Sequence, residues 1–175
     1  DTVIKNCNIN NFSTSIVFLN SSGAVVNNTE NTGTIRLNET SGGVNTLFNS
    51  TYNSVLSTPT TAASLEVYWP VKINVKNNNN TLNNNNALNA IITLTDSQNR
   101  VTQKTAQGGD QGGEAEFIVQ EARFGSSQSS VNYNPYNVRA ELSLYIPVES
   151  TENFTASSAK EIMEIIMTQT PSTNG

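Results

Sequence analysis

The side chains that could do chemistry in this chain lack the partners that most catalytic sites need. Histidine is absent, and Cys7 is the only cysteine. The commonest general base, the usual zinc ligands and every Ser-His or Cys-His nucleophile pair are therefore excluded. A single cysteine offers neither a disulfide framework nor a thiolate metal site, and we expect Cys7 to be a small buried residue.

Each group of acidic or glycine residues that could form a site has a simpler explanation. Asp110, Glu114 and Glu116 could offer oxygen ligands to Ca²⁺, but their spacing fits no EF-hand and indicates a solvated strand edge. Residues 108–113 are rich in glycine but lack the Gly-Lys-Ser/Thr end of a phosphate-binding loop, which favours a hairpin turn. The remaining acids are Glu149, Glu152, Glu161 and Glu164. No pattern in the sequence brings two of them together as the paired carboxylates that a glycosidase requires.

The aromatic residues could form a platform for sugar rings: Tyr68, Trp69, Tyr133, Tyr136 and Tyr145. Core packing of Trp69 and a structural corner at Tyr136 explain them better. The sequence therefore predicts a protein without catalytic residues, metal site or cofactor, and not an enzyme.

Charge excludes two classes of partner. The net charge is -5 and the pI is about 4.6, which argues against nucleic acid because that partner needs a basic surface. No run of basic residues could hold an anionic membrane, and no apolar run could span one. Neither nucleic-acid binding nor membrane insertion is expected.

The polar surface favours a secreted or cell-surface protein. Charged residues make up 13% of the chain, against about 25% in an average soluble domain, and Asn, Ser and Thr take their place. A start at Asp1 indicates a processed protein or a fragment. Seven Asn-x-Ser/Thr sequences are glycosylation candidates, although an Asn-rich chain also makes such sequences by chance: Asn11, Asn20, Asn27, Asn38, Asn49, Asn79 and Asn153.

The stretch from Leu65 to Lys76 divides the chain into two kinds of sequence. Its apolar residues alternate with period two, which predicts one long strand with a buried face: Leu65, Val67, Trp69, Val71, Ile73 and Val75. Before it, apolar triplets followed by Asn recur about every twenty residues across 1–57. This period lies in the range of solenoids, and Asn tolerates the left-handed backbone of a tight bend. We therefore expect rungs of a parallel β-helix with Asn side chains bonded from rung to rung; a β-meander is the alternative.

The rungs resemble those of NosD-like right-handed parallel β-helix proteins, on Thr2–Asn20 and Val44–Asn53. The resemblance covers about the first third of the chain and implies a surface protein, as in archaea and bacteria. Some such proteins bind or cleave carbohydrate and others are structural, but the acid clusters of a pectate-lyase-like site are missing here. A β-helix of two or three rungs has raw ends, so upstream chain or a neighbouring subunit should complete it.

The second part of the chain alternates in a way that predicts a β-sandwich. Strands are expected at 87–95, 101–106, 114–122, 131–140 and 142–146, with turns at 96–100 and 107–113. The stretch 159–167 fits an edge strand better than an amphipathic helix, but the helix stays an open alternative. The run from Leu65 to Ala140 resembles transthyretin-like or carboxypeptidase-regulatory-like Ig folds, a module that often follows NosD-like β-helices in archaeal surface proteins.

The expected fold is all-β, with short parallel β-helix-like rungs followed by an Ig-like β-sandwich. The expected organisation is rungs at 1–57, a linker at 58–64, the sandwich at 65–170 and a tail at 171–175. The favoured function is a non-enzymatic extracellular structural protein, a subunit or fragment of a filament, sheath or S-layer-like assembly. Its expected partners are identical or related subunits and glycans; a carbohydrate-binding or adhesive module, or a fragment of a β-helix carbohydrate-active protein, is the alternative.

Overall fold

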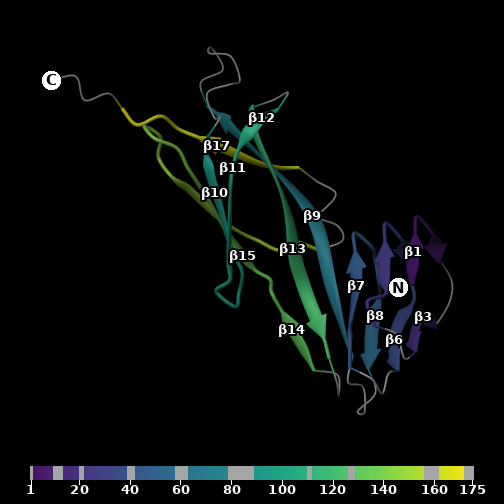
Figure 1. The fold of residues 1–175 in the computed structure, drawn as a ribbon. Coiled ribbons are helices and arrows are strands. Elements are labelled where there is room, and N and C mark those ends of the chain that lie inside the picture. The colour runs from purple at the N-terminus through teal and green to yellow at the C-terminus, as the bar shows by residue number, and fades with distance from the viewer. Residues whose placement is uncertain are drawn as a thin grey trace. The chain divides into compact units, whose positions relative to one another are not determined.

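The chain is all-β, as the sequence predicts, in a computed structural model (Figure 1). The structure describes residues 2–9, 14–19, 22–38, 42–57, 63–78, 89–109, 112–125, 129–155 and 162–171. Over these residues we find no helix of the length and apolarity that crossing a bilayer requires.

The long strand predicted around Trp69 is confirmed. It is β9 (Ser64–Asn77), and the six alternating apolar residues from Leu65 to Val75 are each 2% exposed or less. Pro70 lies inside this strand without interrupting a ladder of hydrogen bonds. The last partner of β7 is Tyr68 and the first partner of β17 is Ile73, so the missing N–H of Pro70 falls between the two pairings.

The chain forms two compact units, and both β9 and β13 (Gly112–Phe124) contribute to each of them. Unit 1 comprises residues 1–70 and 118–133, and unit 2 comprises residues 71–117 and 134–175. The chain passes from one unit to the other at 70/71, 117/118 and 133/134. Residues 58–62 of the predicted linker at 58–64 lie outside the described residues.

Unit 1 is built from three successive coils of chain that stack in parallel (Figure 1). The first coil contains β1 (Val3–Lys5), β2 (Asn8–Ile9) and β3 (Thr14–Leu19). The second contains β4 (Val25–Asn27), β5 (Glu30–Asn31) and β6 (Thr34–Asn38), and the third contains β7 (Val44–Phe48) and β8 (Ser54–Ser57). Parallel pairing joins β1, β4, β7 and β9 in one sheet and β3, β6 and β8 in another.

Asparagines occupy one corner of each coil, as the sequence predicts. Asn6, Asn28 and Asn49 have φ of 53°, 50° and 47°, the left-handed conformation that Asn tolerates better than most residues. The Asn49 side-chain nitrogen donates to the Asn28 side-chain oxygen at 2.7 Å. This bond is a rung-to-rung contact of the predicted kind, and it links the third coil to the second.

Unit 2 contains two sheets, each with one buried face. One has the order β11-β10-β15-β16 and is antiparallel. The other is formed by β17, β9, β13 and β12, which belong to the same eight-stranded sheet as β1, β4 and β7. The additional strands are β10 (Ile91–Thr95), β11 (Val101–Thr105), β12 (Gln107–Gly109), β15 (Tyr136–Glu141), β16 (Val148–Glu152) and β17 (Met163–Met167). The buried side chains of Ile73, Ile92, Phe117, Val138 and Met167 form its core.

Several local predictions for the second part of the chain are confirmed and two are wrong. The single strand expected at 131–140 is instead β14 (Ser130–Asn132) and β15, which are separated by residues 133–135. Asp96 makes the predicted turn by accepting hydrogen bonds from the backbone of Gln98 and Arg100 at 2.9 Å. Strand is confirmed for Met163–Met167, and β12 pairs with β13 as the glycine-rich hairpin requires. The strand expected at 142–146 is instead a turn, because Leu144 has a φ of 68° that breaks the alternation. No strand was expected from the sequence at the position of β16.

Candidate assembly surface

The first coil of unit 1 has an unpaired side. Among the described residues, β1 pairs only with β4, β2 only with β5 and β3 only with β6. Backbone bonds from Val25 to Thr2 and from Asn6 to Asn27 show which groups of β1 face the second coil. Because successive residues of a strand point to opposite edges, the N–H and C=O groups of Val3 and Lys5 face away from it.

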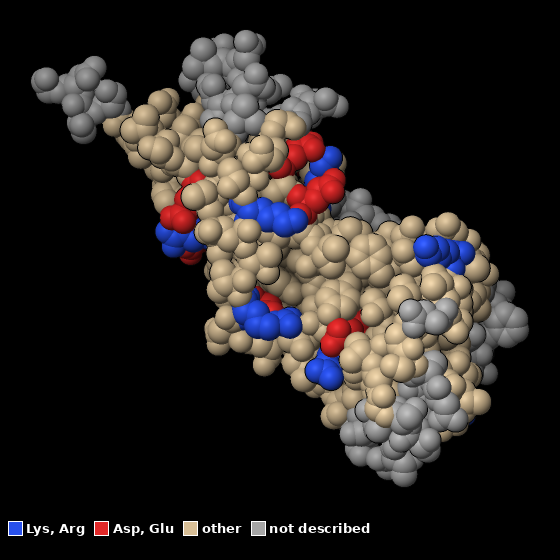
Figure 2. Space-filling view, viewed as in Figure 1, with Lys and Arg blue, Asp and Glu red and all other residues tan. Residues whose placement is uncertain are grey.

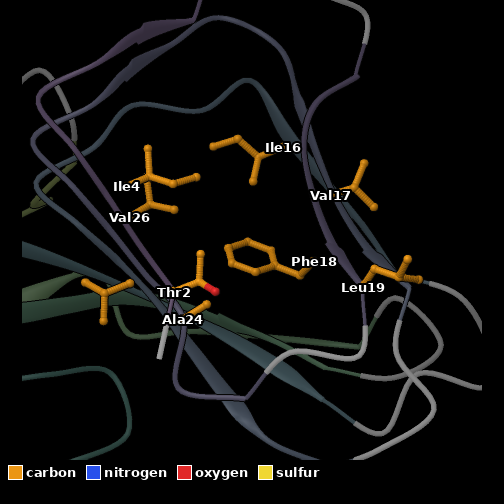
Figure 3. A pocket seen from close by; sticks show the side chains of 9 residues that line it. Thr2, Ile4, Ile16, Val17, Phe18, Leu19, Ala24 and Val26 are labelled. Carbon is orange, nitrogen blue, oxygen red and sulfur yellow. The ribbon is translucent and has the colours of Figure 1, made fainter.

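A hollow of about 200 Å³ lies at this end of the stack (Figure 3). Its lining is apolar apart from Thr2 and comes from the first coil and β4. Ile4, Ile16, Phe18 and Val26 point into the space that the coils enclose, whereas Val17 points away from it. The interior of the coil is therefore open on the side of the first coil that faces away from β4.

Exposure along the stack shows that the first coil is under-packed. Ile4, Val26, Leu47 and Val67 occupy equivalent positions in successive parallel strands. Ile4 is half-buried, while the exposed fractions of the next three are 1%, 0% and 0%. On the β3 side, Phe18 is 5% exposed and its partner Leu37 is 0% exposed. A further β layer on the first coil would give Ile4 and Phe18 the packing that the later coils have.

The same coil carries few charges and an accessible thiol. Lys5 is the only charged side chain among its described residues. Figure 2 shows the same character more widely: charged groups form small separate clusters on a face of mostly uncharged residues. The prediction that Cys7 is buried is wrong: it is exposed, with its Sγ 3.2 Å from the carbonyl oxygen of Lys5. Cys7 lies between β1 and β2, where the chain turns, and not on an inward-facing strand position.

A second polar feature of unit 1 is a carboxylate held inside the packing of aromatic rings. Glu121 accepts hydrogen bonds from Trp69 Nε1 at 2.6 Å and from the Tyr52 hydroxyl at 3.4 Å. Burial raises the pKa of Glu121, although both hydrogen bonds act to lower it. Burial also raises the pKa of Tyr52, as does the neighbouring Glu121 charge. Trp69 is 1% exposed, so its predicted core position is confirmed.

The glycosylation candidates divide by accessibility. Asn11, Asn20 and Asn79 lie outside the described residues, Asn27 and Asn49 are half-buried, and Asn38 and Asn153 are exposed. The side-chain amide of Asn49 is already used in its bond to Asn28. Asn38 and Asn153 are therefore the described positions where a sugar chain would disturb the fold least.

Three of the other candidate acids form ion pairs. Glu114 forms an ion pair with Lys72 at 2.6 Å, and Glu149 pairs with Arg139 at 2.9 Å. Glu164 pairs with Lys76, whereas Asp110 and Glu161 are outside the described residues. Within the described part of the chain, no three Cys, Asp or Glu side chains gather in a way that could hold a metal ion. Tyr136 is buried against Phe154, with ring centres 5.4 Å apart, and cannot present its face to a sugar.

Two of these features were not singled out from the sequence. Ile4, Ile16 and Phe18 have the period-two spacing of inward-facing strand residues, but only the pairing order shows that they lie on the last layer of a stack. Glu121 could have been noticed as an acid within the apolar run of β13, between Val119 and Ala122.

Comparison with known proteins adds no relative. A scan of protein-family models, a search of curated proteins and a search of solved structures each give no match to this chain. The resemblance to NosD-like rungs and to Ig-like modules stays a prediction from the residues that carry it.

Proposed function

We propose that this chain is a non-enzymatic structural protein of the cell surface. It is a subunit or fragment of a filament, sheath or S-layer-like assembly in which β-strand contacts join neighbouring subunits. Exposed strand edges are templates for pairing with another chain, and such pairing is a common way of joining proteins.

The observation that carries the proposal is the unpaired side of the first coil. Among the described residues, three strands there have a neighbour on one edge only, and the open interior beside them is lined by Ile4, Ile16 and Phe18. Strand pairing would satisfy backbone groups, and apolar contact would remove the half-buried Ile4 from water, whereas Ile16 and Phe18 are already buried. Burial of apolar surface contributes about 25 cal/mol per Å², so both effects favour a partner with β structure.

An extracellular setting is supported by the surface chemistry. Charged residues are sparse, and Asn38 and Asn153 present accessible glycosylation sequences. Sugars attached there would replace hydration that charged side chains usually provide. The resemblance of the rungs to archaeal and bacterial surface proteins points the same way, towards an archaeal glycoprotein with an adhesive or scaffolding role.

The test is the native mass of the purified 175-residue chain, with negative-stain imaging, for wild type and two variants at one position. Val3→Pro removes an N–H that faces away from the stack and should abolish assembly, because proline cannot donate to an added strand. Val3→Ala keeps the N–H and should assemble like wild type. Far-UV circular dichroism and Trp69 fluorescence establish that both variants are folded.

Assembly that requires the Val3 N–H supports the proposal. A wild-type chain that stays monomeric at all accessible concentrations, or a Val3→Pro variant that assembles normally, overturns it. In the first case glycan arrays would test the adhesive alternative.

A further inference from the structure

The two ends of the coil stack in unit 1 do not match each other. At the first coil, β1, β2 and β3 each have a neighbour on one edge only among the described residues. At the third coil, β7 already pairs with β9, and among the described residues β8 is the strand with a single neighbour. In a head-to-tail stack, the third coil of one copy would offer one free strand edge, that of β8, to the three free edges of the next copy's first coil. The coil could therefore not continue from copy to copy.

The first coil is, in contrast, suited to meet its own copy. Its inward side chains are apolar, and Lys5 is its only described charge, so two such faces bring together no cluster of like charges. A two-fold axis across this face reverses the strand direction in the partner copy. The first-coil strands of the two copies then meet antiparallel, which is the more stable pairing per residue.

We propose that a second copy of this chain docks head-to-head on the first coil and closes the hollow. Ile4, Ile16 and Phe18 of both copies then share one apolar core, and the unpaired edges of the two first coils satisfy each other. The inference rests on the proposed self-association and adds the surface, the orientation and the number of copies. Because the contact uses the same face of both copies, it closes at two, and a longer assembly must join these dimers through another surface.

The experiment uses Cys7 as a built-in reporter. It is the only thiol, it is exposed, and it lies on the first coil, so a spin label on the wild-type chain needs no other substitution. In reducing buffer before labelling, size-exclusion chromatography with light scattering should give a dimer. Pulsed electron-spin measurements should then give one narrow distance below about 40 Å, twice the length of a six-residue strand.

Ile4→Lys places a charge in the shared core and should convert the dimer to monomer. Val17→Lys is the matched control, since Val17 lies beside the hollow but its side chain points away from the space that the coils enclose and is already 51% exposed. If Ile4→Lys does not fold, the label distance in wild type decides the question by itself.

The outcomes separate this inference from the broader function. A dimer with a short label distance supports both. Long polymers in which the Cys7 labels are far apart, or which Ile4→Lys does not disturb, overturn the head-to-head contact while leaving self-association. A monomer overturns both.

Discussion

The sheet edges of the two units differ in how they meet solvent. In unit 2 the edge strand β11 is exposed at all five residues and carries Gln103 and Lys104. The opposite edge strand β16 carries Glu149 and Glu152. Charged and polar side chains on short edge strands are a common protection against unwanted pairing. In unit 1, β1 and β3 have less such protection, because Lys5 is their only charged residue and their other residues are mostly apolar.

The internal packing differs as well. Unit 1 places similar residues on top of one another, as in Ile4, Val26 and Leu47, so each layer is completed by the layers on both sides. Unit 2 completes its antiparallel sheet with neighbouring strands, and ion pairs such as Lys72–Glu114 lie on its surface. A stack of layers needs something at its end, whereas an antiparallel sheet with guarded edges does not. The comparison therefore favours unit 1 as the place of the proposed interaction surface.

The largest expected effect tests whether the stack in unit 1 holds together by its own layers. Leu47→Ala removes a fully buried side chain between Val26 and Val67, and should cost about 2–5 kcal/mol of unfolding free energy. Leu94→Ala is the matched change in unit 2, where Leu94 is 1% exposed. Urea unfolding followed by Trp69 fluorescence reports on unit 1, so it should shift more for Leu47→Ala. Equal shifts would show that the units unfold as one, and would remove the basis for treating them separately.

A smaller effect is expected at the asparagine corner. Asn49→Ala forces a residue with a Cβ to keep a φ near 47° and removes the bond to Asn28, for a loss of about 1–3 kcal/mol. Asn49→Gly accepts this φ and loses only the hydrogen bond, so about 0.5–1.5 kcal/mol is expected. Thermal unfolding by circular dichroism compares the two. Equal losses would mean that the side-chain bond, and not the backbone conformation, explains the choice of asparagine.

Much of this architecture could be predicted because it depends on local alternation and spacing. The strand around Trp69 has six apolar residues in strict alternation, and the corners of the coils repeat Asn about every twenty residues. The turn at 142–146 could not be predicted, since Leu142, Leu144 and Ile146 alternate like a strand and only the left-handed backbone at Leu144 reveals otherwise.

The assembly surface was harder to predict for a different reason. Alternation shows that Ile4 and Phe18 point inwards, but it does not show that their coil has a neighbour on one side only. That property depends on which strands pair, over separations of about twenty residues. The burial of Glu121 likewise depends on Tyr52 and Trp69, which are far from it in sequence.

The smallest expected effect concerns pH and again separates the units. The pKa of Glu121 is raised by burial, so its contribution to the stability of unit 1 is fully present below the ordinary glutamate pKa of about 4.3. That contribution is lost as the pH rises through the raised pKa, because the carboxylate then ionises and its charged form is more stable in the unfolded chain. Glu121→Gln keeps an oxygen that can accept from Trp69 Nε1 and removes the titration.

We therefore expect the unfolding midpoint of wild type to fall relative to that of Glu121→Gln between pH 4 and pH 7. Other carboxylates titrate in both proteins and cancel in the difference. Far-UV circular dichroism should follow the transition beside Trp69 fluorescence, since the indole lies against the substituted group. The difference should remain unchanged when Glu114→Gln is introduced in unit 2, where the carboxylate is near the surface and paired with Lys72. Parallel pH curves for wild type and Glu121→Gln would show that the carboxylate is solvated, and the aromatic cluster would then be looser than its hydrogen bonds indicate.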